Sequence, residues 1–151
     1  MKEISSGDGT IIVRPFAPGD LKYVHAIEKA SFPDPWSRDS FMAELAHYSN
    51  LFWIAEQNRG TILGYCVCLT VGDELYIKKI AVDPAKRRNG IGRTLLTSIE
   101  EYALKNTTTK ISLDCDEKNL GAQAFYAAIG FKPVTPQGLR LNKIIYLKEL
   151  R

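Results

Sequence analysis

The chain lacks a long apolar segment. Along its 151 residues, no run approaches the ~18 apolar residues that a membrane-spanning helix requires. The charged start at Lys2 and Glu3 is not followed by the apolar core of a secretory signal. We therefore expect a cytoplasmic protein that does not associate with membranes.

Cysteine is also scarce. The three residues Cys66, Cys68 and Cys115 are odd in number and do not form a plausible disulfide framework for a chain of this size. No histidine or second cysteine pair near Cys66 and Cys68 completes a zinc site. We predict that the chain binds no metal and that all three cysteines are small core residues.

An excess of either charge is missing as well. Twenty Lys and Arg residues against seventeen Asp and Glu give a net charge of +3. Such a balance fits an anionic small ligand but falls short of the strongly basic surface of a nucleic-acid binder, so we expect no nucleic-acid partner. Repeats and low-complexity tracts are absent too, and we expect residues 1–151 to form a single domain.

What is present is a regular alternation of strand and helix patterns. β-branched and alternating segments predict strands at residues 10–14, 51–56, 62–71, 74–82, 110–115, 131–134 and 139–147. Apolar residues at helical spacing predict four helices: one after Asp20, one capped by Ser37, one opening at Gly90 and one from 119 to a stop at Gly130. We predict an α/β fold with a mixed, mostly antiparallel sheet of about seven strands and about four helices on both faces.

One connection has the composition of an anion-binding loop. A strand ends at Val82, and Gly90 and Gly92 open the next helix, so unpaired amides lie at the positive end of a helix dipole. Glycine lets an oxygen approach the backbone, while Arg87 and Arg88 add positive charge. The alternative is a basic turn with solvated arginines. The loop has neither the Gly-Lys-Ser/Thr ending of a P-loop nor the third glycine of a dinucleotide-binding turn.

Two motifs carry a family resemblance. Arg87-x-x-Gly90-x-Gly92, directly after Ile80-Ala81-Val82-Asp83-Pro84, resembles the acetyl-CoA-binding motif of the GNAT superfamily. Asn119 followed by Phe125-Tyr126-Ala127-Ala128-Ile129-Gly130-Phe131 is similar to that superfamily's other helix, in which a tyrosine precedes a Gly-Phe turn by four residues. The resemblance implies acetyl-CoA as co-substrate, with contacts from Ile80, Ala81, Val82, Arg87, Arg88, Asn89, Gly90, Ile91, Gly92, Arg93, Asn119 and Tyr126.

A third stretch narrows the resemblance. Residues 32–41, with Pro35-Trp36-Ser37, are similar to the ribosomal-protein alanine N-acetyltransferase (RimI) group. In such enzymes the strand that corresponds to 80–82 splays from its neighbour and binds the pantetheine arm, and a backbone amide near Val82 is the implied donor to the thioester oxygen. The resemblance also implies direct transfer to a primary amine, with a protein N-terminal α-amine as the preferred acceptor.

Two side chains are the catalytic candidates. Tyr126 can give a proton to the leaving thiolate, since a phenol and a thiol have comparable basicity. The alternative is an aromatic core residue beside Phe125 and Phe131. Asp114 stands where RimI-like enzymes carry a glutamate acting as general base, and it is one methylene shorter.

Other titratable residues are weaker candidates. The rival carboxylates Asp73, Glu74, Asp116 and Glu117 are interpreted as solvated turn residues. The two histidines, His25 and His47, lie on the N-terminal helices and are interpreted as surface or partly packed residues. Asn119 can contact coenzyme, cap the helix, or do both.

The chain departs from the group at two places. Only residues 135–138 connect the last two strands, where related enzymes have a longer tyrosine-containing loop over the peptide. Lys78 and Lys79 are expected to point to opposite faces of their strand, which would favour an acidic or anionic acceptor. A small-molecule amine acetyltransferase and a non-catalytic coenzyme A binding module therefore remain as alternatives.

Overall fold

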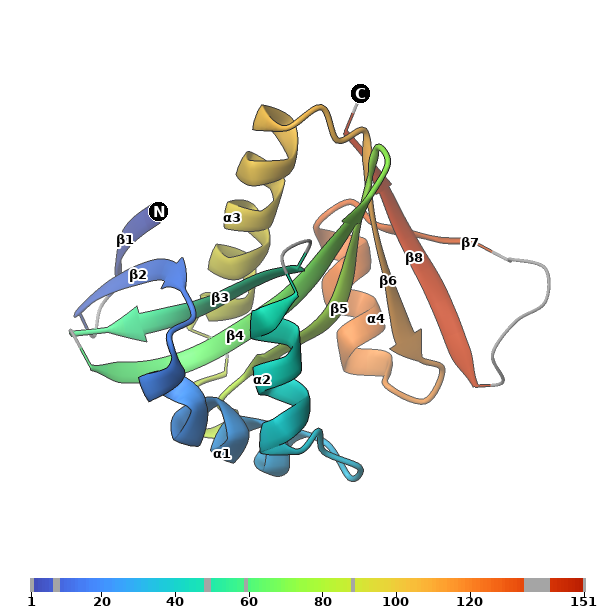
Figure 1. The fold of residues 1–151 in the computed structure, drawn as a ribbon. Helices are drawn as coiled ribbons and strands as arrows, with labels where there is room; N and C mark the ends of the chain where they lie inside the picture. The colour runs from blue at the N-terminus through green and yellow to red at the C-terminus, as the bar shows by residue number, and fades with distance from the viewer. Residues whose placement is uncertain are drawn as a thin grey trace.

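The computed structural model describes residues 2–6, 9–47, 50–58, 60–87, 89–134 and 142–150 (Figure 1). The strands are β1 (Lys2–Ser6), β2 (Gly9–Pro15), β3 (Asn50–Gln57), β4 (Thr61–Val71), β5 (Glu74–Val82), β6 (Lys110–Asp116), β7 (Lys132–Val134) and β8 (Lys143–Glu149). The α-helices are α1 (Leu21–Ser31), α2 (Arg38–Ala46), α3 (Ile91–Lys105) and α4 (Leu120–Ala128), and two 3-10 turns are η1 (Pro18–Asp20) and η2 (Pro84–Lys86).

The described strands form one sheet in the order β1-β2-β3-β4-β5-β6-β8-β7. Strands β3, β4 and β5 make the predicted antiparallel meander, and the one parallel pair in the described sheet is β5 with β6. The predicted mixed α/β fold is confirmed. The sheet has one strand more than expected, because the polar segment β1 pairs with β2 at the edge, from Lys2 opposite Val13 to Ser6 opposite Gly9.

The helices cover both faces of the sheet, as predicted (Figure 1). On one face α1 and α2 pack over β3 and β4 through a cluster that includes Phe41, Phe52 and Tyr65. On the other face α3 and α4 pack through a larger cluster that includes Leu95 and Ile99. The positions of these two apolar clusters determine where a ligand can reach each face of β5 and β6.

The ends of three helices test the residues predicted to cap or stop them. Ser37 caps α2, accepting a hydrogen bond from the N–H of Ser40 at 3.1 Å, and Gly130 follows α4 with a φ of +101°, both as predicted. Asp20 precedes α1, but its carboxylate binds the Arg14 guanidinium at 2.9 Å instead of the helix amides. The cap prediction for Asp20 is wrong because its oxygens accept hydrogen bonds from the Arg14 guanidinium and from the backbone N–H of Ala17.

The three cysteines are free and buried. All three belong to the larger core cluster, which confirms their interpretation as core residues. The turn at 135–138 and the start of the predicted last strand at 139–141 lie outside the described residues.

Candidate active site between strands β5 and β6

The site begins where β5 and β6 stop pairing. The parallel ladder runs only from Glu74 opposite Lys110 to Ile77 opposite Leu113. Beyond it β5 continues to Val82 and β6 to Asp116 with no further pairing between them in the described sheet. Figure 1 shows the two strands side by side at one end and diverging toward the other. The last residues of β5 therefore have a free edge.

A β-bulge lies at the point of divergence. Val67 of β4 opposes Lys79, whereas the next residue, Cys68, opposes Ile77, so Lys78 is an extra residue in β5. Such a bulge bends its strand and places two successive side chains on similar sides. The Lys78 ammonium lies 2.7 Å from Glu44 of α2 and the Lys79 ammonium 2.7 Å from Glu28 of α1.

The prediction that Lys78 and Lys79 point to opposite faces is therefore wrong. Both ammonium groups reach carboxylates on the helices of one face, because the bulge interrupts the alternation on which the prediction depended. Since each lysine is paired within the chain, neither supplies an uncompensated positive charge for an anionic acceptor.

Backbone groups of β5 face the free edge. The N–H of Asp83 donates to the carbonyl of Leu63 on β4 at 2.7 Å. Because successive residues of a strand direct their backbone groups to opposite sides, those of Ile80 and Val82 face away from β4, and those of the residue between them face β4. The Val82 carbonyl is reached there by Arg87, whose Nε lies 3.3 Å away.

The N-terminus of α3 is built on Gly90. This residue has a φ of +78° and open space where a Cβ would stand, so glycine satisfies the left-handed backbone without strain. The first helical hydrogen bond joins the N–H of Thr94 to the Gly90 carbonyl at 2.9 Å. The amides before Thr94 have no partner inside the helix, which gives the predicted anion-binding end.

Gly92 has a different reason for being glycine. A Cβ built at this position would stand 3.3 Å from the Phe125 ring of α4 and 3.7 Å from Val82. Its missing side chain thus permits close packing between α3 and α4. An added Cβ would thus meet the Phe125 ring at Gly92, whereas at Gly90 it would meet nothing within 4 Å.

Arginine flanks this helix end. Arg87 is exposed and, besides its contact with Val82, lies 3.5 Å from the Ser31 hydroxyl at the end of α1. Arg88 lies outside the described residues. The turn is held by Asn89, whose amide donates to the Lys86 carbonyl at 3.3 Å. Positive charge and free amides therefore share one end of α3.

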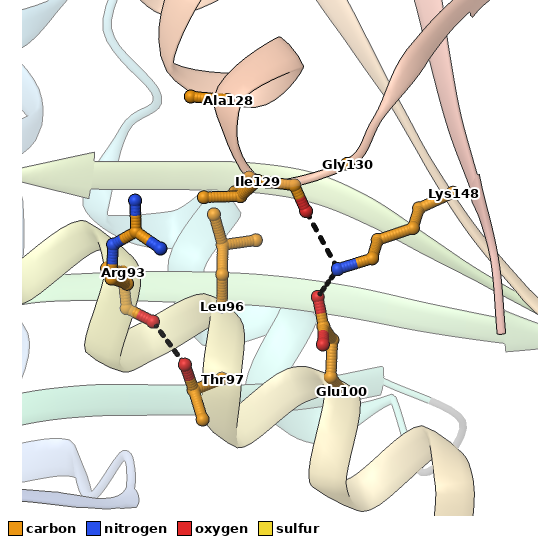
Figure 2. Close-up of a pocket in the computed structure, with 8 residues that line it drawn as sticks. All are labelled: Arg93, Leu96, Thr97, Glu100, Ala128, Ile129, Gly130 and Lys148. Atoms are coloured by element: carbon orange, nitrogen blue, oxygen red, sulfur yellow. Dashed lines mark hydrogen bonds and ion pairs between the residues drawn. The ribbon is translucent and has the colours of Figure 1, made fainter.

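Two further residues of the motif lie on α3 itself. Ile91 is 2% exposed and packs in the core, so only its backbone is available to a ligand. Arg93 borders a cavity of about 410 Å³ between α3, the end of α4 and β8 (Figure 2). The cavity is lined by Arg93, Leu96, Thr97, Glu100, Ala128, Ile129, Gly130 and Lys148. Lys148 binds Glu100 at 2.5 Å and the Ile129 carbonyl at 2.8 Å, so its charge is already matched there.

Tyr126 lies on the face covered by α3 and α4. It is 9% exposed and its ring packs against Phe125, Phe131 and Tyr146. Burial raises the pKa of its phenol above the ordinary value, and the neighbouring Cys115 of β6 adds to the rise. No described residue accepts a hydrogen bond from its hydroxyl. A buried phenol that can still donate a hydrogen bond therefore lies beside the point where β6 diverges from β5.

Asp114 is the first residue of β6 beyond the ladder. It follows Leu113, the last residue paired with β5, and its side chain alternates to the face opposite the core residues Leu113 and Cys115. Its Oδ2 accepts a hydrogen bond from the Tyr76 hydroxyl at 3.3 Å. Tyr76 was not a sequence candidate. Tyr76 lies opposite Ser112 in the ladder, two residues before Asp114, so the contact can be inferred only once the parallel register is known.

The two catalytic candidates therefore lie on opposite faces of the divergence, and two of the rival carboxylates, Asp73 and Glu74, lie away from it. Asp73 accepts from the Thr109 hydroxyl at 2.8 Å, and Glu74 accepts from the Ser112 hydroxyl at 2.7 Å, at the far end of the ladder. Asp116, the last residue of β6, and Glu117, in the turn before α4, are exposed. His25 is half-buried in α1 and His47 is exposed at the end of α2.

Asn119 acts as a helix cap. Its side-chain oxygen accepts the N–H of Ala122 at 3.0 Å at the start of α4. The side chain is exposed. Among the described residues, no group of three or more His, Cys, Asp and Glu side chains could hold a metal, and no described helix has the length and apolarity to span a membrane.

The fold and this site define an acetyltransferase. The model of the acetyltransferase (GNAT) family matches residues 21–131, and the chain belongs to that family. It is an acetyl-CoA-dependent N-acetyltransferase, which uses the coenzyme as co-substrate and an amine as acceptor. The superfamily resemblance of the two motifs is thereby confirmed.

Similar proteins with named activities indicate a group within the GNAT family. The chain is 32% identical, over 82% of its length and 80% of the relative's, to a Bacillus subtilis protein provisionally named a ribosomal protein bS18-alanine N-acetyltransferase. It is 29% identical, over 83% of its length and 91% of the relative's, to the ribosomal protein bS18-alanine N-acetyltransferase of Haemophilus ducreyi. The crystal structure of the Escherichia coli ribosomal-protein-S18-alanine N-acetyltransferase superposes with a TM-score of 0.81 at 26% identity, covering 92% of this chain and 93% of that one.

Proposed function

We propose that the chain transfers the acetyl group directly from acetyl-CoA to the α-amine of a protein N-terminus. One observation carries the proposal: where β5 and β6 diverge, an unpartnered buried phenol lies on one face and a carboxylate on the other. A thioester held between the strands would be reached by a proton donor from the first face and by an acceptor amine from the second.

The coenzyme would occupy the face of α3 and α4. Its pyrophosphate would bind the amides at Gly90 and the side chains of Arg87 and Arg88, and its pantetheine arm would bind the edge of β5 at Ile80 and Val82. The Val82 N–H is the proposed donor to the thioester oxygen. Asn89, Ile91, Gly92 and Arg93 would contribute backbone or flanking contacts, and Asn119 would contribute its side-chain amide.

The proposed chemistry balances in one transfer. The neutral amine attacks the thioester carbon, so an N–C bond forms and the C–S bond breaks. The proton lost by the nitrogen passes to Asp114, directly or through one water, and the sulfur takes the proton of Tyr126. Solvent then restores the protons, and the products are an amide and free coenzyme A.

The acceptor class follows from proton affinity. An α-amine has a pKa of about 7.7–8.0, whereas a lysine amine has about 10.4. A good share of α-amines is therefore neutral near pH 7.5, and a short carboxylate such as Asp114 has little deprotonation to perform. The similarity to relatives named ribosomal protein bS18-alanine N-acetyltransferases supports the same class of acceptor.

The acceptor test uses two peptides of one composition. The first has a free N-terminal alanine and acetylated lysines, and the second has a blocked N-terminus and one free lysine. We expect kcat/KM for thiol release to be at least about tenfold higher with the first at pH 7.5. Equal rates, or turnover only with small amines, would overturn the α-amine proposal, and saturable acetyl-CoA binding without thiol release would indicate a binding module.

The coenzyme site has its own test. Arg87→Ala should weaken acetyl-CoA binding about tenfold in a calorimetric titration, because one charged contact to phosphate is lost. Lys105→Ala removes the same charge at the other end of α3 and should leave the Kd within about twofold, since screening weakens so distant a charge. An unchanged Kd for Arg87→Ala would place the pyrophosphate elsewhere.

A further inference from the structure

A buried carboxylate joins four elements on the face of α1 and α2. Glu28 of α1 is 0% exposed. One of its oxygens accepts the Tyr65 hydroxyl of β4, and the other accepts the backbone N–H of Trp36 at 2.8 Å and the Lys79 ammonium of β5 at 2.7 Å. Every one of these donors comes from a different part of the fold, so the carboxylate fixes their relative positions.

The Lys79 ammonium has a second set of contacts. It lies 4.1 Å from the centre of the Phe32 ring and 4.9 Å from that of Trp36. Both distances are within the range of cation–π attraction, which is stronger for a desolvated cation. The side chain is only 13% exposed. One ammonium therefore holds a carboxylate and two aromatic rings together.

These contacts restrain the connection between α1 and α2. At one end the Phe32 N–H donates to the Glu28 carbonyl at 3.0 Å, and at the other the Trp36 N–H donates to the Glu28 carboxylate. Two of the intervening residues, Pro33 and Pro35, have no N–H to donate. A single residue of α1 thus anchors both ends of the connection, and Lys79 binds both of its aromatic residues.

The position of Lys79 relates this connection to the reaction. Lys79 follows the bulge residue Lys78 and precedes Ile80, whose backbone groups face the free edge of β5. Its side chain points to the face of α1 and α2, the same face as Asp114, where the proposed function requires the acceptor to enter. Lys79, which belongs to the divergent part of β5, thereby holds residues 32–36 beside the free edge of that strand.

We propose that Lys79 is a positioning residue for the acceptor: with Glu28 it fixes the connection at 32–36 as one wall of the acceptor site. The inference rests on the proposed function. It assigns Lys79 no contact with coenzyme and no part in proton transfer. Loss of the ammonium should release Phe32 and Trp36 and raise the acceptor KM, while the acetyl-CoA Kd stays unchanged.

The test separates positioning from stability. Lys79→Met alone leaves a buried, uncompensated carboxylate and can fail to fold. The double variant Glu28→Gln/Lys79→Met removes both charges and keeps one acceptor oxygen for the Trp36 N–H, while the new amide NH2 can donate to the Tyr65 hydroxyl oxygen. We expect this variant to fold, with an acceptor KM raised about tenfold and an acetyl-CoA Kd within about twofold of the parent. Lys78→Met, which loses an ion pair of the same length on the same face, is the matched control and should change neither constant.

A second readout does not depend on turnover. The chain has two tryptophans, so in a Trp53→Phe background the fluorescence reports Trp36 alone. Acrylamide quenching should increase in the double variant relative to that background. An unchanged acceptor KM, an equal loss of acetyl-CoA affinity, or unchanged quenching would overturn the proposal. If the parent transfers acetyl to no amine, the proposed function fails, and the quenching result still decides whether Lys79 holds the connection.

Discussion

Tyr126→Phe should lower kcat by about 100-fold or more while the acetyl-CoA Kd stays within about twofold. The substitution keeps the ring in its cluster with Phe125, Phe131 and Tyr146 and removes only the hydroxyl. Without that proton donor, the thiolate must leave unprotonated. Single-turnover release of coenzyme A from the preformed complex measures the step directly.

The pH dependence of this group has a defined sign. Because burial and Cys115 raise the pKa of Tyr126, the phenol keeps its proton throughout the neutral and mildly alkaline range. The wild-type kcat should therefore not fall between about pH 7 and 9.5 through loss of this proton. Tyr146→Phe removes a hydroxyl from the same cluster and is the matched control, with kcat expected to be unchanged. Full activity of Tyr126→Phe would refute the acid role.

Asp114→Asn should lower kcat/KM for the acceptor about 100-fold at pH 7. The loss should shrink as the pH rises past the amine pKa of about 8, because the acceptor then arrives already neutral. Asp114→Glu should retain most of the activity, since the longer side chain brings the carboxylate nearer to the edge of β5. A pH profile of kcat/KM for the three proteins measures this dependence.

The control for Asp114 is Glu74→Gln. Glu74 lies on the neighbouring strand at the other end of the β5–β6 ladder, about 10 Å from the divergence at the usual strand rise. It binds the Ser112 hydroxyl and lies 3.9 Å from Lys110. We expect its replacement to leave the pH profile unchanged. A uniform loss for Asp114→Asn at all pH values would contradict a base and indicate a structural role for the bond to Tyr76.

Periodicity and turn residues predicted most of the fold. Patterns within a single segment are sufficient to predict α3, from its stripe of apolar residues, and β3, β4 and β5, from their β-branched runs. The sequence does not predict the edge strand β1, because its residues are largely polar and no alternation of apolar residues marks the segment. Pairing with β2 supplies its order, and that pairing is not encoded in the segment itself.

The site was predictable only where its chemistry is local. Gly90 and Arg87 lie within a few residues of each other and could be interpreted together. The bulge at Lys78, by contrast, exists only in the register between β4 and β5, so the orientation of both lysines was predicted wrongly. Tyr76 and Glu28 became part of the site through contacts with residues 38 and 51 positions away, which no spacing rule connects.

Gly92 illustrates a limit of motif reading. Two glycines of one motif have separate physical causes, a left-handed backbone at Gly90 and a neighbouring ring at Gly92. A sequence shows both as missing side chains. The position of Phe125, on another helix, is what distinguishes the two.

The short parallel ladder between β5 and β6 also has a mechanical meaning. Four residue pairs, from Glu74 with Lys110 to Ile77 with Leu113, join strands β1 to β5 to the remaining three. An extended ligand bonded along Ile80 and Val82 would take the place of the missing ladder and tie the two half-sheets together. The hydrogen bonds that bind the ligand would then also make the sheet more rigid. After the product has left, the two half-sheets would be freer to move against each other.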